Sequence, residues 1–233
     1  MKTNVLFLMA LVVLVAAPAH ADEDGCIAAR YAAFGKYLGC EAKAAAKGPS
    51  DSAFLKCRQQ YAAAWTKLGP KYPGTSCDGA RFVDNGDGTI TDKLTQLVWE
   101  KKTTDVGSGE NYSDRHDVDN TYTWSISETA ADGTAYTDFL DNLNGSGFAG
   151  QHDWRLPTLF ELHTIASTDS VPCGSAPCVA DPIFAATQSN LYWSSSTHQG
   201  SPTFAWYVSF QEGLTDAGVK PLNGWVRAVR AGS

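Results

Sequence analysis

The sequence lacks several features that decide a protein's class at once. After residues 5–17 it contains no apolar run long enough to cross a bilayer, and it contains no internal repeat or low-complexity tract. Basic residues are few, with 18 Lys and Arg against 25 Asp and Glu, and they form no run. An acidic chain without a basic run is a poor match to nucleic acid or to an anionic membrane surface. We therefore expect no nucleic-acid partner and no insertion into a membrane.

Signatures of several catalytic and metal-binding classes are also missing. The sequence has no C-x-x-C pair, which counts against a metal bound by cysteine thiolates. It has no G-x-S-x-G segment, which counts against a serine hydrolase built from residues 194–196, His198 and Asp153. Glu161 beside His163 has the composition of a general base, but a helix-capping role already accounts for this glutamate. We therefore expect no catalytic residue and no enzyme activity.

Residues 1–21 have the composition of a leader for export. Lys2 precedes the apolar run, and Ala19-His20-Ala21 is a small-x-small cleavage site. This pattern predicts a signal peptide that is cut after Ala21. All six cysteines lie beyond that point, and an even number of cysteines in an exported chain predicts three disulfides. We expect the protein in the periplasm, outside the cell or on its surface.

Residues 22–78 carry the pattern of a helical hairpin. Apolar residues recur at helical spacing over 22–47 and again over 51–68, and Gly48-Pro49 separates the two runs. Cysteines at equal distances from that break face each other when the two helices are antiparallel. The predicted disulfides are Cys40–Cys57 across the hairpin, Cys26–Cys77 at its open end and Cys173–Cys178 within a short loop.

The stretch 150–166 predicts an extended segment that turns into a capped helix. Pro157 disfavours helical dihedrals for the residue before it, so Trp154 and Leu156 are expected in extended chain. Thr158 and Glu161 have the spacing of a capping box, and apolar residues follow at helical spacing. We expect the flanking strands to pack against this unit.

The remaining pattern predicts an α+β fold. The helical hairpin at 22–78 is followed by a mixed domain at 79–233. In that domain we expect a polar surface loop at 103–120 and a helix in the second half of 122–144 that Gly145 ends. Short strands are predicted at 82–83, 89–91, 94–100, 191–197, 203–210 and 225–230.

Six blocks of the mixed domain, taken in order, resemble a known family. They are 81–92 (RFVDNGDGTITD), 97–100 (LVWE), 153–162 (DWRLPTLFEL), 192–196 (YWSSS), 205–210 (AWYVSF) and 226–230 (VRAVR). The family is the Lcl C-terminal domain family, also called domain of unknown function 1566. The third and last blocks are also similar to the formylglycine-generating enzyme superfamily. This resemblance implies a C-type-lectin-like fold, with two helices against short twisted antiparallel strands.

The resemblance also implies binding or adhesion rather than catalysis, because characterised relatives are surface or secreted modules. The expected ligand is a glycan or a surface protein. Two alternatives stay open. One is a structural subunit of a cell-surface or filament assembly that docks through the helical hairpin. The other is an enzyme of the formylglycine-generating type, which requires an unpaired cysteine or a bound metal.

Asp84, Asn85 and Asp87 look like part of a calcium-binding loop. The first position of such a loop would be Val83 and the twelfth would be Leu94, and neither supplies a carboxylate. A hairpin turn with Asn-Gly and Asp-Gly accounts for the same residues. The Glu-Pro-Asn and Gln-Pro-Asp segments through which C-type lectins bind sugar and calcium do not occur either. We therefore expect no cofactor, with calcium as the alternative at these three residues.

The candidate ligand surface comes from strand alternation. Over 204–210 alternation places four apolar side chains on a core face and Tyr207 on the outward face. Aromatic rings on an outward face can stack on sugars. Tyr207 together with Arg115, His116 and Arg227 is the predicted ligand-binding set, and the loop 103–120 is the segment best placed to supply further contacts.

Overall fold

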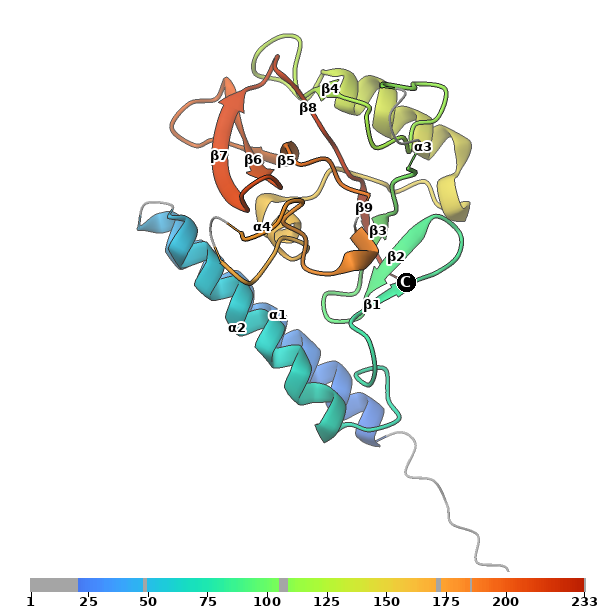
Figure 1. Cartoon of the computed structure of the whole chain (residues 1–233), viewed down its shortest axis with the longest axis vertical. Coiled ribbons are helices and arrows are strands. Elements are labelled where there is room, and N and C mark those ends of the chain that lie inside the picture. Colours follow the sequence, from blue (N-terminus) through green and yellow to red (C-terminus); the bar gives the residue numbers. More distant parts are fainter. Residues whose placement is uncertain (1–20, 48–49, 105–108, 171–172, 185, 233) are drawn as a thin grey trace, which may run out of the picture.

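The computed structural model describes residues 21–47, 50–104, 109–170, 173–184 and 186–232. Two antiparallel helices, α1 (Ala21–Ala46) and α2 (Asp51–Lys71), lie along one side of a mixed domain of short strands and helices (Figure 1). This arrangement confirms the predicted α+β class with a helical hairpin. Residues 1–20 of the predicted leader (1–21) and the Gly48-Pro49 break lie outside the described residues. Within the described ranges, no helix combines the length and the apolar content that crossing a bilayer requires.

The helical hairpin is held by two disulfides. Cys40–Cys57 joins α1 to α2, and Cys26–Cys77 joins the start of α1 to the segment after α2, as predicted. Between the helices, Tyr37 stacks on Tyr61 with ring centroids 4.5 Å apart. Helix α2 continues to Lys71, beyond the predicted helical run of 51–68.

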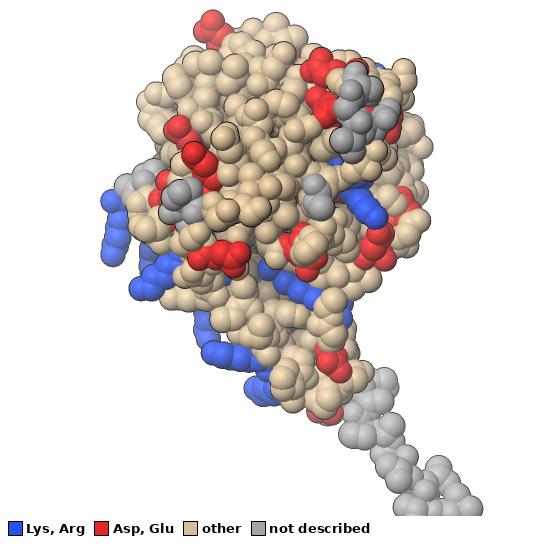
Figure 2. Space-filling model, viewed as in Figure 1, with Lys and Arg blue, Asp and Glu red and all other residues tan. Residues whose placement is uncertain are grey.

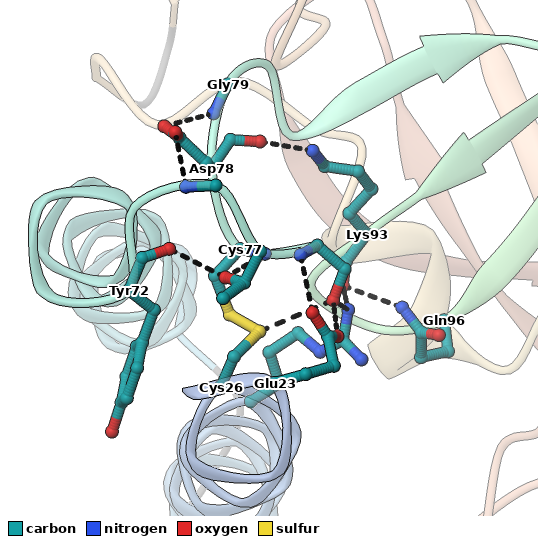
Figure 3. Close-up of a disulfide and its surroundings, with 12 residues drawn as sticks. Glu23, Cys26, Tyr72, Cys77, Asp78, Gly79, Lys93 and Gln96 are labelled. Carbon is teal, nitrogen blue, oxygen red and sulfur yellow. Dashed lines mark hydrogen bonds between the residues drawn. A yellow bond between two sulfur atoms is a disulfide. The ribbon is translucent and has the colours of Figure 1, made fainter. Parts of the chain in front are cut away.

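The base of the hairpin is tied to the first strands of the mixed domain. Figure 3 shows the Cys26–Cys77 disulfide beside Lys93, whose ammonium group donates to the Asp78 carbonyl. Arg30 of α1 donates to the Lys93 carbonyl at 3.2 Å. The carboxylate of Glu23 accepts from the Ser76 amide at 2.9 Å. These polar contacts hold the open end of the hairpin against the domain.

A four-stranded antiparallel sheet opens the mixed domain. Its strand order is β1 (Phe82–Asp84), β2 (Thr89–Asp92), β3 (Leu97–Glu100) and β9 (Val229–Ala231). The last strand of the chain pairs with β3, with Trp99 opposite Val229. The end of the chain therefore closes the sheet that its first strands began (Figure 1).

A second antiparallel sheet has the order β5 (Leu191–Thr197), β6 (Phe204–Ser209), β7 (Leu214–Val219). Each of its faces is covered at least in part. On β6, Val208 belongs to one apolar cluster and Ala205 to another, and both side chains are fully buried. The expected solvent face of β6 is therefore partly covered by a second core, at Ala205. A short pair, β4 (Tyr122–Thr123) and β8 (Asn223–Gly224), lies at the far end of the domain.

The predicted stretch 150–166 joins the two apolar clusters of the domain. Trp154 and Leu156 are buried in the cluster that contains α3 (Asp141–Ser146). Leu159 and Leu162 of α4 (Leu159–His163) are buried in the other cluster, which lies between the two larger sheets. The capping box is present: the Thr158 hydroxyl accepts from the Glu161 amide, and the Glu161 carboxylate accepts from the Thr158 amide.

The helix predicted within 122–144 is present, but its ends and its helix type differ from the prediction. It begins with one turn of π-helix, η1 (Ala135–Leu140), and continues as α3. Gly147, at φ +66°, ends it in the left-handed conformation that favours glycine, rather than Gly145. Two single 3-10 turns complete the domain, η2 (Phe148–Gly150) and η3 (Pro182–Phe184).

Candidate functional site

A cleft lies between the helical hairpin and the mixed domain. Its volume is about 840 Å³, within the range of small-molecule and side-chain sites. One wall comes from α1 and α2, and the other comes from the start of α4 and the turn that joins β5 to β6. The lining residues are Phe34, Leu38, Ala42, Ala45, Ala46, Phe54, Thr158, Leu159, Phe160, Glu161, Ser196, Thr197, His198, Gln199, Gly200 and Trp206.

The two walls differ in chemistry. The described α1 and α2 residues that line the cleft are all apolar, from Phe34 to Phe54. Helical spacing explains this wall, because Leu38, Ala42 and Ala45 recur at intervals of four and three residues on one face. The opposite wall combines Leu159, Phe160 and Trp206 with hydroxyl, amide and imidazole groups. The cleft is therefore apolar on one side and mixed on the other.

An aromatic pair forms the mixed wall beside the β5–β6 turn. The rings of His198 and Trp206 lie 4.7 Å apart between centroids, tilted by 41°. Nδ1 of His198 is buried and has no hydrogen-bond partner in the described chain. A buried ring nitrogen without a partner costs free energy unless a ligand or a water molecule satisfies it. Because this nitrogen has almost no accessible surface, a ligand in the cleft would contact it only after the ring turned.

Among the described residues that line the cleft, Glu161 is the one Asp, Glu, Lys or Arg. Its negative charge is neutralised by Arg155. Arg155 binds both carboxylate oxygens through its two terminal nitrogens, each at 2.7 Å. Burial raises the pKa of Glu161, but the Arg155 and Thr158 hydrogen bonds outweigh it and hold the pKa below its usual value. The carboxylate stays ionised with its oxygens occupied, so it offers little to a basic ligand.

The cleft is preformed because the hairpin is locked onto the domain below it. Nδ1 of His163 lies 2.9 Å from a Glu41 carboxylate oxygen of α1, and Nε2 of His163 lies 2.7 Å from the Thr215 hydroxyl of β7. The hydroxyl of Tyr37 donates to the Phe160 carbonyl at 2.7 Å. Arg58 of α2 is buried and donates to the Gly213 carbonyl at 3.4 Å. These bonds fix the distance between the two walls.

The predicted ligand residues lie away from this cleft. Arg115 pairs with Asp138 at 2.9 Å, and His116 lies 2.9 Å from a Glu100 oxygen. Burial raises the pKa of the Glu100 carboxyl, but Lys102 and His116 outweigh it and lower the pKa to about 2. Arg115 and His116 are partly exposed and adjacent, and their contact with a ligand stays a prediction.

Arg227 is buried whereas Tyr207 is partly exposed, so the two do not share one outward surface as the sequence indicated. Arg227 is 1% exposed and donates to the carbonyls of Glu100 and Ala186, each at 2.7 Å. It acts as a structural link between β3 and the segment after η3. Tyr207 is half-buried, with its ring edge-on to Trp193 at 5.8 Å. A second core covers only part of the face that the alternation assigned to solvent, at Ala205, and the contact of Tyr207 with a ligand stays a prediction.

Asp84, Asn85 and Asp87 form the β1–β2 turn. Asp84 accepts from the Gly86 amide at 2.9 Å, and Asp87 accepts from the Thr89 amide at 3.0 Å. Asp84 also pairs with Lys101. These oxygens are therefore used within the turn. In the described part of the chain, no group of three or more His, Cys, Asp or Glu residues is arranged to hold a metal ion.

The candidate catalytic groups are held apart in other contacts. The Ser194 hydroxyl donates to the Trp206 carbonyl at 2.7 Å, and Asp153 pairs with Arg230 at 2.7 Å. His163 is paired with Glu41 rather than with Glu161. The third predicted disulfide, Cys173–Cys178, is present, so all six cysteines of the chain are bridged.

A family model decides the classification of the mixed domain. The model of the Lcl C-terminal domain matches residues 88–230. The chain belongs to the Lcl C-terminal domain family. Searches of curated proteins and of solved structures give no match. The relation of this Lcl C-terminal domain to the formylglycine-generating enzymes and to C-type lectins stays a prediction.

The family match covers one wall of the cleft. Thr158, Ser196, His198 and Trp206 lie within the Lcl C-terminal domain, whereas Phe34 and the other helical residues lie outside the match. The hairpin therefore completes a site that the matched region does not form by itself. Sequence reasoning missed this cleft because it assigned Trp206 to the core. One available signal was the segment 182–211, which contains no Asp, Glu, Lys or Arg.

Proposed function

We propose that the protein is an exported, non-catalytic binding module that captures a glycan or a surface protein in the cleft between the helical hairpin and the Lcl C-terminal domain. The observation that carries this proposal is the cleft itself, with about 840 Å³ between an apolar helical wall and a wall that contains Trp206 and His198. The locking bonds of Glu41 and His163 support a preformed site, which lowers the entropic cost of binding.

The state of the cysteines and carboxylates supports a role without catalysis. The enzyme alternative needs a reactive thiol or a metal, and the six cysteines are all in disulfides. Glu161 has its oxygens bound by Arg155 and by the Thr158 amide, which removes the proton-accepting capacity of a general base. Disulfides and the predicted leader are consistent with export.

Binding at the cleft is tested by filling it. Ala42 and Ala32 are both exposed on α1, but only Ala42 lines the cleft. We expect Ala42→Trp to lower binding to positive ligands on a glycan array and in a pull-down of cell-surface proteins, and Ala32→Trp to leave it unchanged. Equal binding by both variants, or no binding by the folded wild type, would contradict the proposal. Thiol titration after unfolding and metal analysis of native protein test the enzyme alternative.

A second candidate function is assembly through the helical hairpin, and a charge asymmetry favours it. Residues 22–78 carry eight Lys and Arg against six Asp and Glu, whereas residues 79–233 carry nine against nineteen. Figure 2 shows Lys and Arg side chains spaced along the hairpin and Asp and Glu side chains scattered over the domain. Sedimentation at low and high salt tests this candidate: salt-sensitive oligomers favour it, and a monomer at all salt concentrations contradicts it.

A further inference from the structure

We infer that the cleft takes an uncharged, apolar segment of a partner protein, with aromatic or aliphatic side chains as anchors. This inference rests on the proposed function, since it names the ligand class of the same site. Three features of the cleft carry it: the absence of available charge, the position of the apolar groups on both sides, and the polar groups confined to one wall.

Two observations indicate that the cleft offers no available charge to a ligand. Glu161 is neutralised by the Arg155 guanidinium, as its two 2.7 Å contacts show. The segment 182–211, which supplies Ser196, His198 and Trp206, contains no Asp, Glu, Lys or Arg, although 18% of the whole chain is charged. A charged ligand group placed here would lose its hydration without gaining an ion pair. The cleft therefore selects against sulfated, phosphorylated, acidic or basic groups.

Apolar surface faces the ligand from both sides. Phe34, Leu38 and Ala42 stand on the helical wall, and Leu159 and Trp206 stand on the other. An apolar ligand side chain between the two walls removes its own apolar surface and that of both walls from water. Burial of apolar surface is the main favourable term in association. A sugar ring carries hydroxyl groups around its edge, and those that face the helical wall would lose water without a replacement partner. The two-sided apolar geometry favours a protein segment over a glycan.

The polar groups of the mixed wall suit the main chain of such a segment. The Ser196 hydroxyl accepts from the Leu159 amide at 3.1 Å, which leaves its own proton to donate. That hydroxyl proton matches a main-chain carbonyl group of a peptide. The wall can therefore satisfy a backbone carbonyl while the anchors fill the apolar part of the cleft.

The experiment is a selection of displayed random peptides on the folded, oxidised wild type. Each enriched peptide is then measured against wild type, Ala42→Trp and the control Ala32→Trp, with a glycan array run on the same three proteins. We expect a motif of aromatic and aliphatic residues without charge, bound by wild type and Ala32→Trp and lost with Ala42→Trp. Placing Lys or Glu at an anchor position should weaken binding about tenfold or more. Ala45→Trp, at a second exposed lining position, repeats the test in case Ala42→Trp does not fold.

The outcomes separate this inference from the proposed function. A charged motif that binds in the cleft would overturn the ligand class. Glycan binding that Ala42→Trp abolishes, without any peptide that it abolishes, would also overturn the ligand class but leave the binding module intact. If no peptide and no glycan responds to either cleft-filling variant, both the inference and the proposed function fail.

Discussion

His163 of α4 and Glu41 of α1 are both fully buried, and Nδ1 of the histidine lies 2.9 Å from a carboxylate oxygen of the glutamate. They lie 122 residues apart in the sequence. The pair joins the helical hairpin to the Lcl C-terminal domain beneath the cleft. Burial lowers the pKa of His163, and Glu41 opposes this shift. A neutral imidazole can donate from Nδ1 to the Glu41 side chain and accept at Nε2 from the Thr215 hydroxyl.

Removing the histidine leaves a buried carboxylate without its donor. We expect His163→Ala to lower the free energy of unfolding by about 3–5 kcal/mol, since it opens a cavity and leaves a buried hydrogen-bond acceptor without its donor. Denaturant unfolding followed by tryptophan fluorescence measures this loss. His152→Ala, at an exposed histidine, is the matched control and should change stability by less than about 0.5 kcal/mol. A similar small change in both variants would show that the pair does not hold the hairpin.

The same pair predicts how stability depends on pH. The pKa of His163 is lower in the folded protein than the usual 6.5. As pH falls, this histidine therefore takes up a proton at a higher pH in the unfolded chain than in the folded protein. Stability is therefore fully present above pH 6.5 and decreases as pH falls from there through the folded pKa. Glu41, Arg58 and Asp51 also face this imidazole.

His163→Gln keeps a side-chain donor but cannot titrate. We expect its unfolding midpoint to change less between pH 7.5 and pH 5.5 than that of the wild type. Midpoints in urea at matched ionic strength give the comparison. Parallel curves for the two proteins would mean that another group sets the pH dependence.

Local patterns predicted the parts of the fold that depend on neighbours in sequence. The capping box of Thr158 and Glu161 and the hairpin disulfides follow from spacing alone, and the structure contains them. Strand β7 was missed because Asp216 and Gly218 interrupt the apolar alternation that marks a strand.

Burial that depends on distant segments was not predictable in the same way. Arg227 is surrounded by the segments of Glu100 and Ala186, which no local pattern places beside it. The cleft was not predictable for the same reason. Its walls come from α1 and from the β5–β6 turn, and only the docked hairpin brings Phe34 and Trp206 to one site.

The three disulfides are expected to contribute unequally. The chain-entropy relation gives about 4 kcal/mol for Cys26–Cys77, about 3 kcal/mol for Cys40–Cys57 and about 2 kcal/mol for Cys173–Cys178, because the loops they close span 51, 17 and 5 residues. Paired Cys→Ser variants and thermal unfolding measure the order. A greater loss from the shortest loop than from the longest would contradict it.

Arg227 is expected to matter for stability and not for binding. Arg227→Lys loses the guanidinium fork that reaches the Glu100 and Ala186 carbonyls, and an unsatisfied buried carbonyl costs about 1–3 kcal/mol. The affinity for any ligand of the cleft should not change, since Arg227 does not line it. Titration of one cleft-dependent ligand against both proteins decides this. A large loss of affinity in a variant of normal fold would restore Arg227 as a ligand contact.

The most direct test of the binding site is a hydrogen-exchange footprint of the oxidised protein with its best-bound ligand. We predict that exchange slows at residues 34–46, 158–161 and 196–206, which contain the walls of the cleft. Slower exchange confined to residues 109–120, around Arg115 and His116, with the cleft segments unchanged, would contradict the account.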